Sequence, residues 1–589
     1  MSNKRLILIE VAIFLFAAVI IGRLFYWQVL KHSDFTVVAK TQLENTVQIG
    51  AKRGKILASD GSILVSNKKV YLMYAILPDI KKLKREDETY DEFSSRLANK
   101  LTAPLLVEAL GKKEKVSIFE KDRLWDEIRS RIAFQLKQPK LIWVPLAKKV
   151  GEETRTRIEK IGMKGIGFEE DTDRFYPEGS LAANLIGFVG SDEQGNEKGY
   201  FGLEGHYDGK LKGRSGTLIQ EVDALGRPIL ASSPEGLGAL DGSDLLTTID
   251  RSVQFLTERK LVEGVRRYGA KAGVVIVLDS KTSAVIASSS FPTFNLLDPA
   301  SSSTDYYKNL GTSEVYEPGS TFKSITFSAA LDSGAIKTDT ICPCKGPIKA
   351  SGYEVQTFDN KYHPNSNVTQ ILQHSDNVGA SFAAQKMGTD TFLKYIRDFG
   401  FGTQSGVDLQ GEETGIIKEL GDWHDIELVT AAFGQGLSVT PIQMVNAMAA
   451  IANDGLLMRP YLVRKIKGPK DEIEFKPKEI RRVIGSSTAT IMKQLLFAAV
   501  EGGEARKIIP YGFRVGGKTG TAQVPIAGKY STKTVASFVG FGPLEEPRFA
   551  MIVALFEPSA SIFAAETAEP LFFEMIKELY PYWGIPVQN

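Results

Sequence analysis

A serine and a lysine three residues apart, Ser320 and Lys323, form the first pair in this sequence whose types and spacing suggest covalent chemistry. They open an apolar, helix-forming run that follows Pro318 and Gly319. Residues three apart on a helix share a face, so the two side chains are expected to meet. A serine hydroxyl becomes a useful nucleophile when a neighbouring base takes its proton, and a desolvated lysine can be that base.

Two further segments could complete such a site. Ser375, Asp376 and Asn377 stand at the start of a helical run, where these residue types are also ordinary helix caps. The segment 518–521, Lys-Thr-Gly-Thr, lies in the glycine-rich, strand-forming C-terminal part of the chain. Each segment alone is a weak signal for catalysis.

The same C-terminal segment also fits the phosphate-binding pattern G-x-x-x-x-G-K-T, from Gly512 to Thr519. A loop of this kind has to follow an apolar strand and open a helix. Here Pro510 precedes the pattern and Pro525 soon follows it, so neither condition is met. We therefore reject a nucleotide-binding function.

Taken in order, S-x-x-K, S-D-N and K-T-G resemble the motif set of active-site-serine penicillin-recognising enzymes. The chain is similar over nearly its whole length to class B penicillin-binding proteins, which are membrane-anchored peptidoglycan D,D-transpeptidases. The family landmarks that recur are the anchor exit at 22–29, R-G-K-I at 53–56, R-F-Y-P at 174–177, G-L-E at 202–204, G-Q-G at 434–436 and S-F-V-G-F at 537–541.

This resemblance implies acyl transfer through a serine acyl-enzyme. Ser320 would attack the penultimate D-Ala carbonyl of a stem peptide, with Lys323 as the general base. Ser375 and Asn377 would relay a proton and hold the peptide amide. Lys518 would supply positive charge in the cleft. Thr519, Gly520 and Thr521 would form the binding site of the substrate carboxylate. The backbone N–H groups of Ser320 and Thr521 would form the oxyanion hole.

The resemblance also sets the expected partners. These are D-Ala-D-Ala stem peptides and β-lactams, with D,D-carboxypeptidase activity as a side reaction; no cofactor and no nucleic acid are expected. Nothing between the anchor and residue 240 resembles a glycosyltransferase motif, so we expect a SEDS-type glycosyltransferase and other divisome membrane proteins as partners. The stretch Ser375–Ala380 is similar to the division-type S-x-N-V-G, which favours septal wall synthesis, and an elongation role stays open.

Two other function classes share part of this pattern. A β-lactamase would hydrolyse the acyl-enzyme, but the Leu-Asn pair of its usual E-x-x-L-N motif occurs nowhere in this sequence. A β-lactam-binding sensor or inactive scaffold would tolerate the loss of Lys518 or Asn377, and both are present. The motifs therefore favour the enzyme.

The only two cysteines, Cys342 and Cys344, flank Pro343. We predict that a pair this close in sequence is too close for an unstrained disulfide. Zinc held with His363 or His374 is a weak alternative, because two cysteines and one unplaced histidine make a poor site. No metal is therefore expected.

The elements that must position these residues begin with a membrane anchor. Residues 1–5 are expected to be a cytoplasmic stub, and the apolar run 6–27, interrupted by Glu10, is long enough to cross a bilayer of about 30 Å. Tyr26 and Trp27 would lie at the interface, and no small-x-small cleavage site follows the run. We expect a single-pass protein of the cell (inner, cytoplasmic) membrane with its catalytic domain outside the cytoplasm.

Beyond the anchor, residues 28–240 are expected to form an elongated, β-rich pedestal (dimerisation) domain and residues 241–589 the transpeptidase domain. Apolar strands at 274–278, 284–288, 534–541 and 549–556 lie at the two ends of the second domain, with long helical patterns between them. This order predicts an α/β (α+β) fold, in which one antiparallel sheet is assembled from both ends and covered by helices. The resemblance implies the same architecture, that of the penicillin-binding transpeptidase and serine β-lactamase-like domain.

Composition agrees with an ordinary globular chain. The 589 residues include 72 Lys and Arg against 70 Asp and Glu, a near-balance that offers no electrostatic footprint for nucleic acid. Two cysteines are too few for a disulfide scaffold.

Overall fold

The computed structural model describes residues 3–36, 44–111, 117–138, 141–221, 235–503, 506, 510–526 and 528–587. These residues fall into two compact units, one made of 1–53 and 212–242 and the other of 54–211 and 243–589. The first unit contains α1 (Asn3–Phe25), the π-helical turn η1 (Tyr26–Leu30) and an antiparallel sheet of β1 (Glu44–Ile49), β8 (Gly216–Glu221) and β9 (Glu235–Leu237).

The N-terminal helix of this unit has the length and composition of a membrane span. Within the stretch from Lys4 to Leu30 an 18-residue window has a mean hydropathy of 2.5, and the predicted span at 6–27 lies within the stretch. The Arg23 guanidinium lies 5.5 Å from the ring of Tyr26 and 4.8 Å from the ring of Trp27. Aromatic and basic side chains of this kind are typical of the membrane–water interface.

The second unit contains a seven-stranded sheet that joins distant parts of the chain. Its order is β17–β16–β10–β2–β3–β4, and β5 pairs with β3. The strands are β2 (Ile56–Leu57), β3 (Ile63–Ile76), β4 (Trp143–Val150), β5 (Ile166–Phe175), β10 (Asp244–Thr247), β16 (Val463–Lys467) and β17 (Glu472–Glu474). The helices α4 (Tyr90–Gly111), α5 (Ile118–Leu136) and α6 (Glu152–Glu159) pack on this sheet and share an apolar core with β3 and β4.

A buried ion pair joins three of the sequence landmarks within this unit. Arg174 donates through Nε to Glu204 at 2.8 Å and through Nη1 to the Gly54 carbonyl at 2.9 Å. Glu204 is fully buried, in the short helix α8 (Gly202–His206). A Cβ on Gly54 would lie 1.9 Å from the Ser243 carbonyl oxygen, so only glycine allows this close backbone approach.

The rest of this unit is built around a second sheet, which confirms the predicted assembly from the two ends of a domain. It is antiparallel, with the order β12–β11–β21–β20–β19. The strands are β11 (Ala272–Asp279), β12 (Val285–Phe291), β19 (Gly516–Ile526), β20 (Lys529–Gly542) and β21 (Phe549–Phe556). The pairing of β11 with β21 joins the early strands to the late ones.

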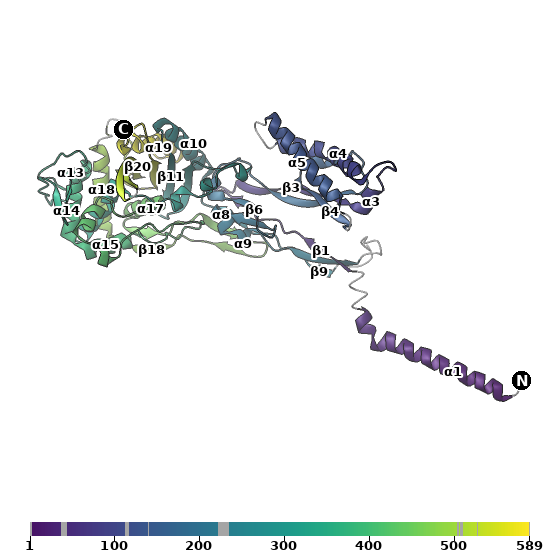
Figure 1. The fold of residues 1–589 in the computed structure, drawn as a ribbon. Coiled ribbons are helices and arrows are strands. Elements are labelled where there is room, and N and C mark those ends of the chain that lie inside the picture. The colour runs from purple at the N-terminus through teal and green to yellow at the C-terminus, as the bar shows by residue number, and fades with distance from the viewer. Residues whose placement is uncertain are drawn as a thin grey trace. The chain divides into compact units, whose positions relative to one another are not determined.

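Helices cover both faces of this sheet (Figure 1). On one face lie α10 (Arg251–Tyr268) and α19 (Ala568–Tyr582), and on the other lie α12 (Lys323–Asp332), α17 (Pro441–Ala452) and α18 (Ser486–Glu501). Thr440 and Gln443 form the capping box of α17, which fixes the start of this helix. The helices around the site are α11 (Leu310–Ser313), α13 (Val368–Gln373), α14 (Asn377–Met387), α15 (Thr389–Asp398) and α16 (Asp425–Ala431).

The buried ion pair gives a test of the fold. Replacing Glu204 by Gln leaves the Arg174 guanidinium buried without its counter-charge, so the free energy of unfolding is expected to fall by about 3 kcal/mol. Chemical denaturation of the variant and of wild type measures this loss. The matched control is Glu178→Gln, because Glu178 pairs with Arg251 through side chains 41% and 44% exposed and should lose less than about 1 kcal/mol. Equal losses in the two variants would contradict the assignment.

Candidate active site

Ser320 lies in a tight turn where two backbone segments touch. The contact is made by two glycines, Gly319 before Ser320 and Gly434 in the other segment. It lies in the 3₁₀ helix η4 (Gly319–Phe322), which leads directly into α12. Gly319 has φ +56° and donates its N–H to the Gly434 carbonyl at 3.0 Å. A Cβ on Gly434 would lie 2.2 Å from the Gly319 oxygen, which explains the first glycine of the G-Q-G landmark. Three residues make one turn of a 3₁₀ helix, so Ser320 and Lys323 are aligned as predicted.

The Lys323 amine is fully buried and has four polar atoms around it, which belong to three residues. Its Nζ lies 2.9 Å from Ser320 Oγ and 3.3 Å from Ser375 Oγ, and it donates to Asn377 Oδ1 at 2.8 Å and to the Ser375 carbonyl. The last two oxygens can only accept hydrogen bonds. A neutral amine has two N–H groups for them and a lone pair left for the Ser320 hydroxyl proton. The geometry therefore suits a base that deprotonates Ser320.

The electrostatic surroundings favour this neutral form. Burial holds the pKa of Lys323 well below its ordinary value, because an ammonium loses its hydration there. The nearby positive charge of Lys518 lowers this pKa further, while the Asp376 carboxylate acts in the opposite direction.

The second predicted motif reaches Lys323 from the start of α14. Ser375 adopts φ +52°, an uncommon left-handed conformation for a residue other than glycine. Asp376 accepts hydrogen bonds from the N–H groups of Val378 and Gly379 and so caps the helix, as its residue type predicted. Asn377 uses its amide oxygen for Lys323 and donates its Nδ2 to the Gln356 carbonyl at 3.1 Å.

The third predicted motif lies on β19. Lys518 is 4% exposed and donates to the carbonyl and hydroxyl oxygens of Thr519, both at 3.2 Å. Thr521 Oγ1 accepts a hydrogen bond from the Ala564 N–H at 3.0 Å. A Cβ on Gly520 would lie 2.6 Å from the Pro318 carbonyl, so this glycine lets β19 pack against the loop before Ser320.

One cavity of about 480 Å³ brings the three motifs together. The predicted residues that line it are Ser320, Ser375, Asn377, Lys518, Thr519 and Thr521. Lys323 and Gly520 are not among the residues that line it. No motif in the sequence pointed to Phe358, in a loop, or to Glu569, in α19, yet both line the cavity. Gln435 also lines it, and its only signal was the G-Q-G landmark.

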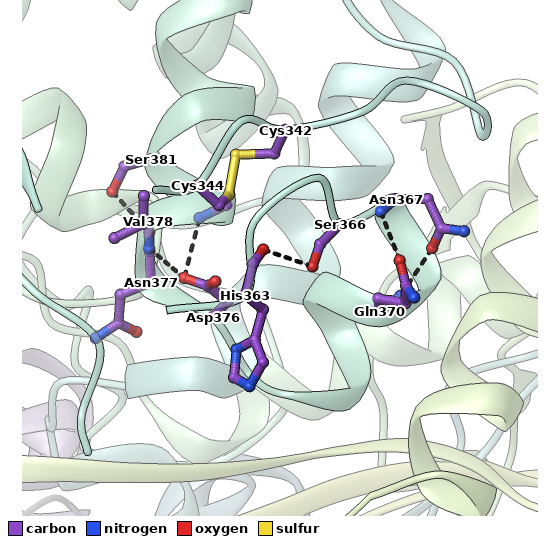
Figure 2. The surroundings of a disulfide bond; sticks show 11 residues. Cys342, Cys344, His363, Ser366, Asn367, Gln370, Asp376, Asn377, Val378 and Ser381 are labelled. Atoms are coloured by element: carbon purple, nitrogen blue, oxygen red, sulfur yellow. Dashed lines mark hydrogen bonds between the residues drawn. A yellow bond between two sulfur atoms is a disulfide. The ribbon is translucent and has the colours of Figure 1, made fainter. Parts of the chain in front are cut away.

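The prediction for the cysteine pair was wrong, because Cys342 and Cys344 form a disulfide (Figure 2). Their Cα atoms are 5.3 Å apart, an ordinary separation for a disulfide. Cys344 has φ +40°, and this turn of the chain brings the two residues together across Pro343. Since the bond uses both sulfurs, the pair offers no thiolate ligands for zinc.

The loop closed by the Cys342–Cys344 disulfide is hydrogen-bonded to the segment 363–366, and that segment contacts the residue before the second motif. The Cys342 N–H donates to the Ser366 carbonyl at 2.9 Å. Ser366 Oγ donates to the His363 carbonyl at 2.8 Å (Figure 2). The His363 ring stacks on that of His374, with 3.9 Å between the ring centroids. His374 precedes Ser375 directly, so the loop contacts the residue next to the second motif.

Comparison with known proteins assigns both parts of the chain. Residues 273–577 match the family model described as the penicillin binding protein transpeptidase domain, and residues 48–247 match the penicillin-binding protein dimerisation domain. The stage V sporulation protein D of Bacillus subtilis is 31% identical over 99% of this chain and 86% of its own length. The peptidoglycan D,D-transpeptidase FtsI of Escherichia coli is 31% identical over 74% of this chain and 71% of its own length.

Solved structures agree with these matches. The crystal structure of a peptidoglycan synthetase from Bifidobacterium adolescentis has a TM-score of 0.71 and 25% identity, covering 93% of this chain and 98% of that one. Penicillin-binding protein 2X from Streptococcus thermophilus has a TM-score of 0.70 and 25% identity, covering 90% of this chain and 80% of that one.

The charges around Lys323 predict how the acylation rate depends on pH. A lysine base works only when neutral, so the rate should rise with pH through the pKa of Lys323 and then level off. Lys518→Met removes a charge that lowers this pKa, so the rise should move to higher pH; Asp376→Asn removes a charge that raises it, so the rise should move to lower pH. The measurement is the second-order rate constant for acylation by penicillin between pH 5 and pH 10.

Two choices of substitution separate the effect of charge on the pKa of Lys323 from other effects on the site. Lys518→Arg keeps the positive charge and should leave the position of the rise unchanged, even if the maximum rate falls. Asn is also a good helix cap, so Asp376→Asn should keep the start of α14 folded. Shifts in the same direction for Lys518→Met and Asp376→Asn would contradict the role of Lys323 as the base.

Proposed function

Because this chain belongs to the class B penicillin-binding proteins, we propose that it crosslinks peptidoglycan by a serine acyl-enzyme mechanism. The substrates are stem peptides that end in D-Ala-D-Ala. The observation that carries the proposal is the Lys323 amine, fully buried and 2.9 Å from Ser320 Oγ, between carbonyl oxygens that only accept hydrogen bonds. β-Lactams acylate Ser320 as substrate mimics, and water in place of the acceptor gives carboxypeptidase activity as a side reaction.

In the first half of the reaction Ser320 Oγ attacks the penultimate D-Ala carbonyl and Lys323 takes its proton. The backbone N–H groups of Ser320 and Thr521 stabilise the oxyanion, a contribution of about 3–4 kcal/mol per donor in other acyl-transfer enzymes. The proton passes through Ser375 to the departing nitrogen, and D-Ala leaves. Asn377 holds the peptide amide of the donor.

The β19 edge of the cleft recognises the donor by its terminal carboxylate. Lys518 supplies positive charge, and the Thr519 and Thr521 hydroxyls donate hydrogen bonds, with Gly520 keeping the strand close to the nucleophile loop. In the second half of the reaction an amine of another stem attacks the ester. A C–N bond forms, the C–Oγ bond breaks, and a proton from the amine returns to Ser320.

We further propose the setting of this reaction. The apolar helix from Lys4 to Leu30 anchors the chain with its N-terminus in the cytoplasm, so that the catalytic domain lies where peptidoglycan is assembled. The S-x-N-V-G pattern at 375–379 supports a role in septal wall synthesis, beside a SEDS-type glycosyltransferase and other divisome membrane proteins.

The acyl-enzyme can be observed directly. Full-length protein in detergent is incubated with penicillin, and its intact mass is followed over hours. Wild type should gain one covalent adduct that persists, whereas Ser320→Ala should gain none. Ser324→Ala is the matched control: Ser324 is a buried serine of α12 that donates to the Thr321 carbonyl, and its loss should leave the adduct in place.

The other outcomes identify the competing functions. An adduct that disappears with hydrolysis of the drug would indicate a β-lactamase. Folded wild-type protein that never gains an adduct would contradict the enzyme and indicate an inactive scaffold.

A further inference from the structure

Two histidine rings form a parallel stack beside the second catalytic motif. The ring centroids of His363 and His374 are 3.9 Å apart, and the angle between the ring planes is 4°. His374 ends α13 and directly precedes Ser375, whereas His363 lies in the loop before α13. The proposed mechanism uses neither ring.

The stack ties the segment 356–366 to the active site. At one end of this segment, the Gln356 carbonyl accepts a hydrogen bond from Asn377 Nδ2 at 3.1 Å. Phe358 of the same segment lines the active-site cavity. Toward the other end, the His363 ring packs on His374. The segment therefore holds the second motif through a hydrogen bond and through the stack.

Ser375 needs such support from outside its own backbone. Its φ of +52° is a left-handed conformation, which costs free energy in a residue other than glycine and persists only when the surroundings hold it. Its carbonyl accepts a hydrogen bond from Lys323, and its hydroxyl lies 3.3 Å from Lys323 Nζ. A fixed His374 ring, one residue earlier, restrains this turn.

Stacking, and not a side-chain hydrogen bond, holds the His363 ring. Within the described part of the chain, His363 Nδ1 is buried and has no hydrogen-bond partner. A neutral imidazole can leave this nitrogen as an acceptor, whereas an imidazolium has a hydrogen on both nitrogens. Full protonation of the pair would therefore add a buried N–H without an acceptor, which is unfavourable.

The charges around the pair determine how many protons it can hold. Burial and the charge of His363 lower the pKa of His374, against the opposite effect of the Asp376 and Asp359 carboxylates. Lys361 lies 3.5 Å from Asp359 and offsets part of its charge. Other charged side chains on elements packed against the pair are exposed or paired: Lys345 beside the disulfide, Glu501 at the end of α18, and Lys493, which pairs with Asp454.

Resting on the proposed function, we propose that the stacked rings of His363 and His374 position Ser375 for catalysis, and that the stack holds only while at most one ring carries a proton. One charged ring over a neutral aromatic ring is an attractive arrangement. Two like charges at the separation of these rings repel each other. The second proton therefore opens the stack and releases both the segment 356–366 and the turn at Ser375.

NMR of the histidine ring protons tests the opening directly, in full-length protein in detergent. Stacked rings shield each other's protons, so wild type should lose this shielding at the second protonation step. His363→Phe and His374→Phe keep two stacked rings but only one titrating group, so their shielding should persist into acid. The second step of wild type should also lie at lower pH than the single step of either variant.

The rate of acylation by penicillin, measured between pH 4 and pH 8, tests the consequence for catalysis. Below the second protonation step, the ratio of the rate of either Phe variant to the wild-type rate should rise about tenfold per unit of pH, because one extra proton inactivates only wild type. Protonation of Lys323 affects all three proteins alike and cancels from this ratio. His206→Gln is the matched control: His206 is exposed on α8, and its loss should leave the wild-type profile unchanged.

The outcomes separate this inference from the proposed function. Phe variants that are slower than wild type by the same factor at every pH would show that the rings only support the fold, and this result would overturn the inference. Shielding that persists in wild type through both protonation steps would overturn it as well, while leaving the transpeptidase intact. A stack that opens as described, in a folded protein that penicillin never acylates, would support the two-proton limit and overturn the proposed function.

Discussion

The active site depends on the burial of one amine, that of Lys323, away from water. Lys323 lies at the first turn of α12, fully buried, where an ammonium would lose its hydration and where a second positive charge, Lys518, stands close by. The surrounding carbonyl oxygens satisfy the two N–H groups of a neutral amine. Of the two hydroxyls beside Nζ, that of Ser320 is the nearer, at 2.9 Å against 3.3 Å for Ser375, so burial and hydrogen bonding together direct the lone pair toward the nucleophile.

The rest of the domain keeps this arrangement closed by direct backbone contact. Gly319 packs on Gly434, and Gly520 packs on the Pro318 carbonyl, so three segments meet with no side chain between them. The sheet on which β19 lies is assembled from strands nearly three hundred residues apart, and helices bury both of its faces. The position of Lys518 relative to Ser320 is therefore set by the sheet as a whole and not by a flexible loop.

Much of this could be predicted from the sequence, because the motifs depend on local rules. The spacing of Ser320 and Lys323 predicted a shared helix face, and the apolar strands at both ends predicted one antiparallel sheet. Cys342 and Cys344 were misjudged, because spacing does not reveal the left-handed turn at Cys344 that closes the disulfide. Phe358 and Glu569 gave no signal, since only the tertiary fold brings a loop residue and a helix residue to the same cavity.

The central claim is that Lys323 is neutral and accepts the proton of Ser320, and neutron diffraction tests it most directly. Crystals of the unliganded protein in D₂O near neutral pD would reveal the deuterium atoms on Lys323 Nζ and Ser320 Oγ. The account predicts two deuterons on Nζ, directed at the Ser375 carbonyl and Asn377 Oδ1, and one on Ser320 Oγ directed at Nζ. Three deuterons on Nζ, one of them directed at Ser320 Oγ, would contradict it.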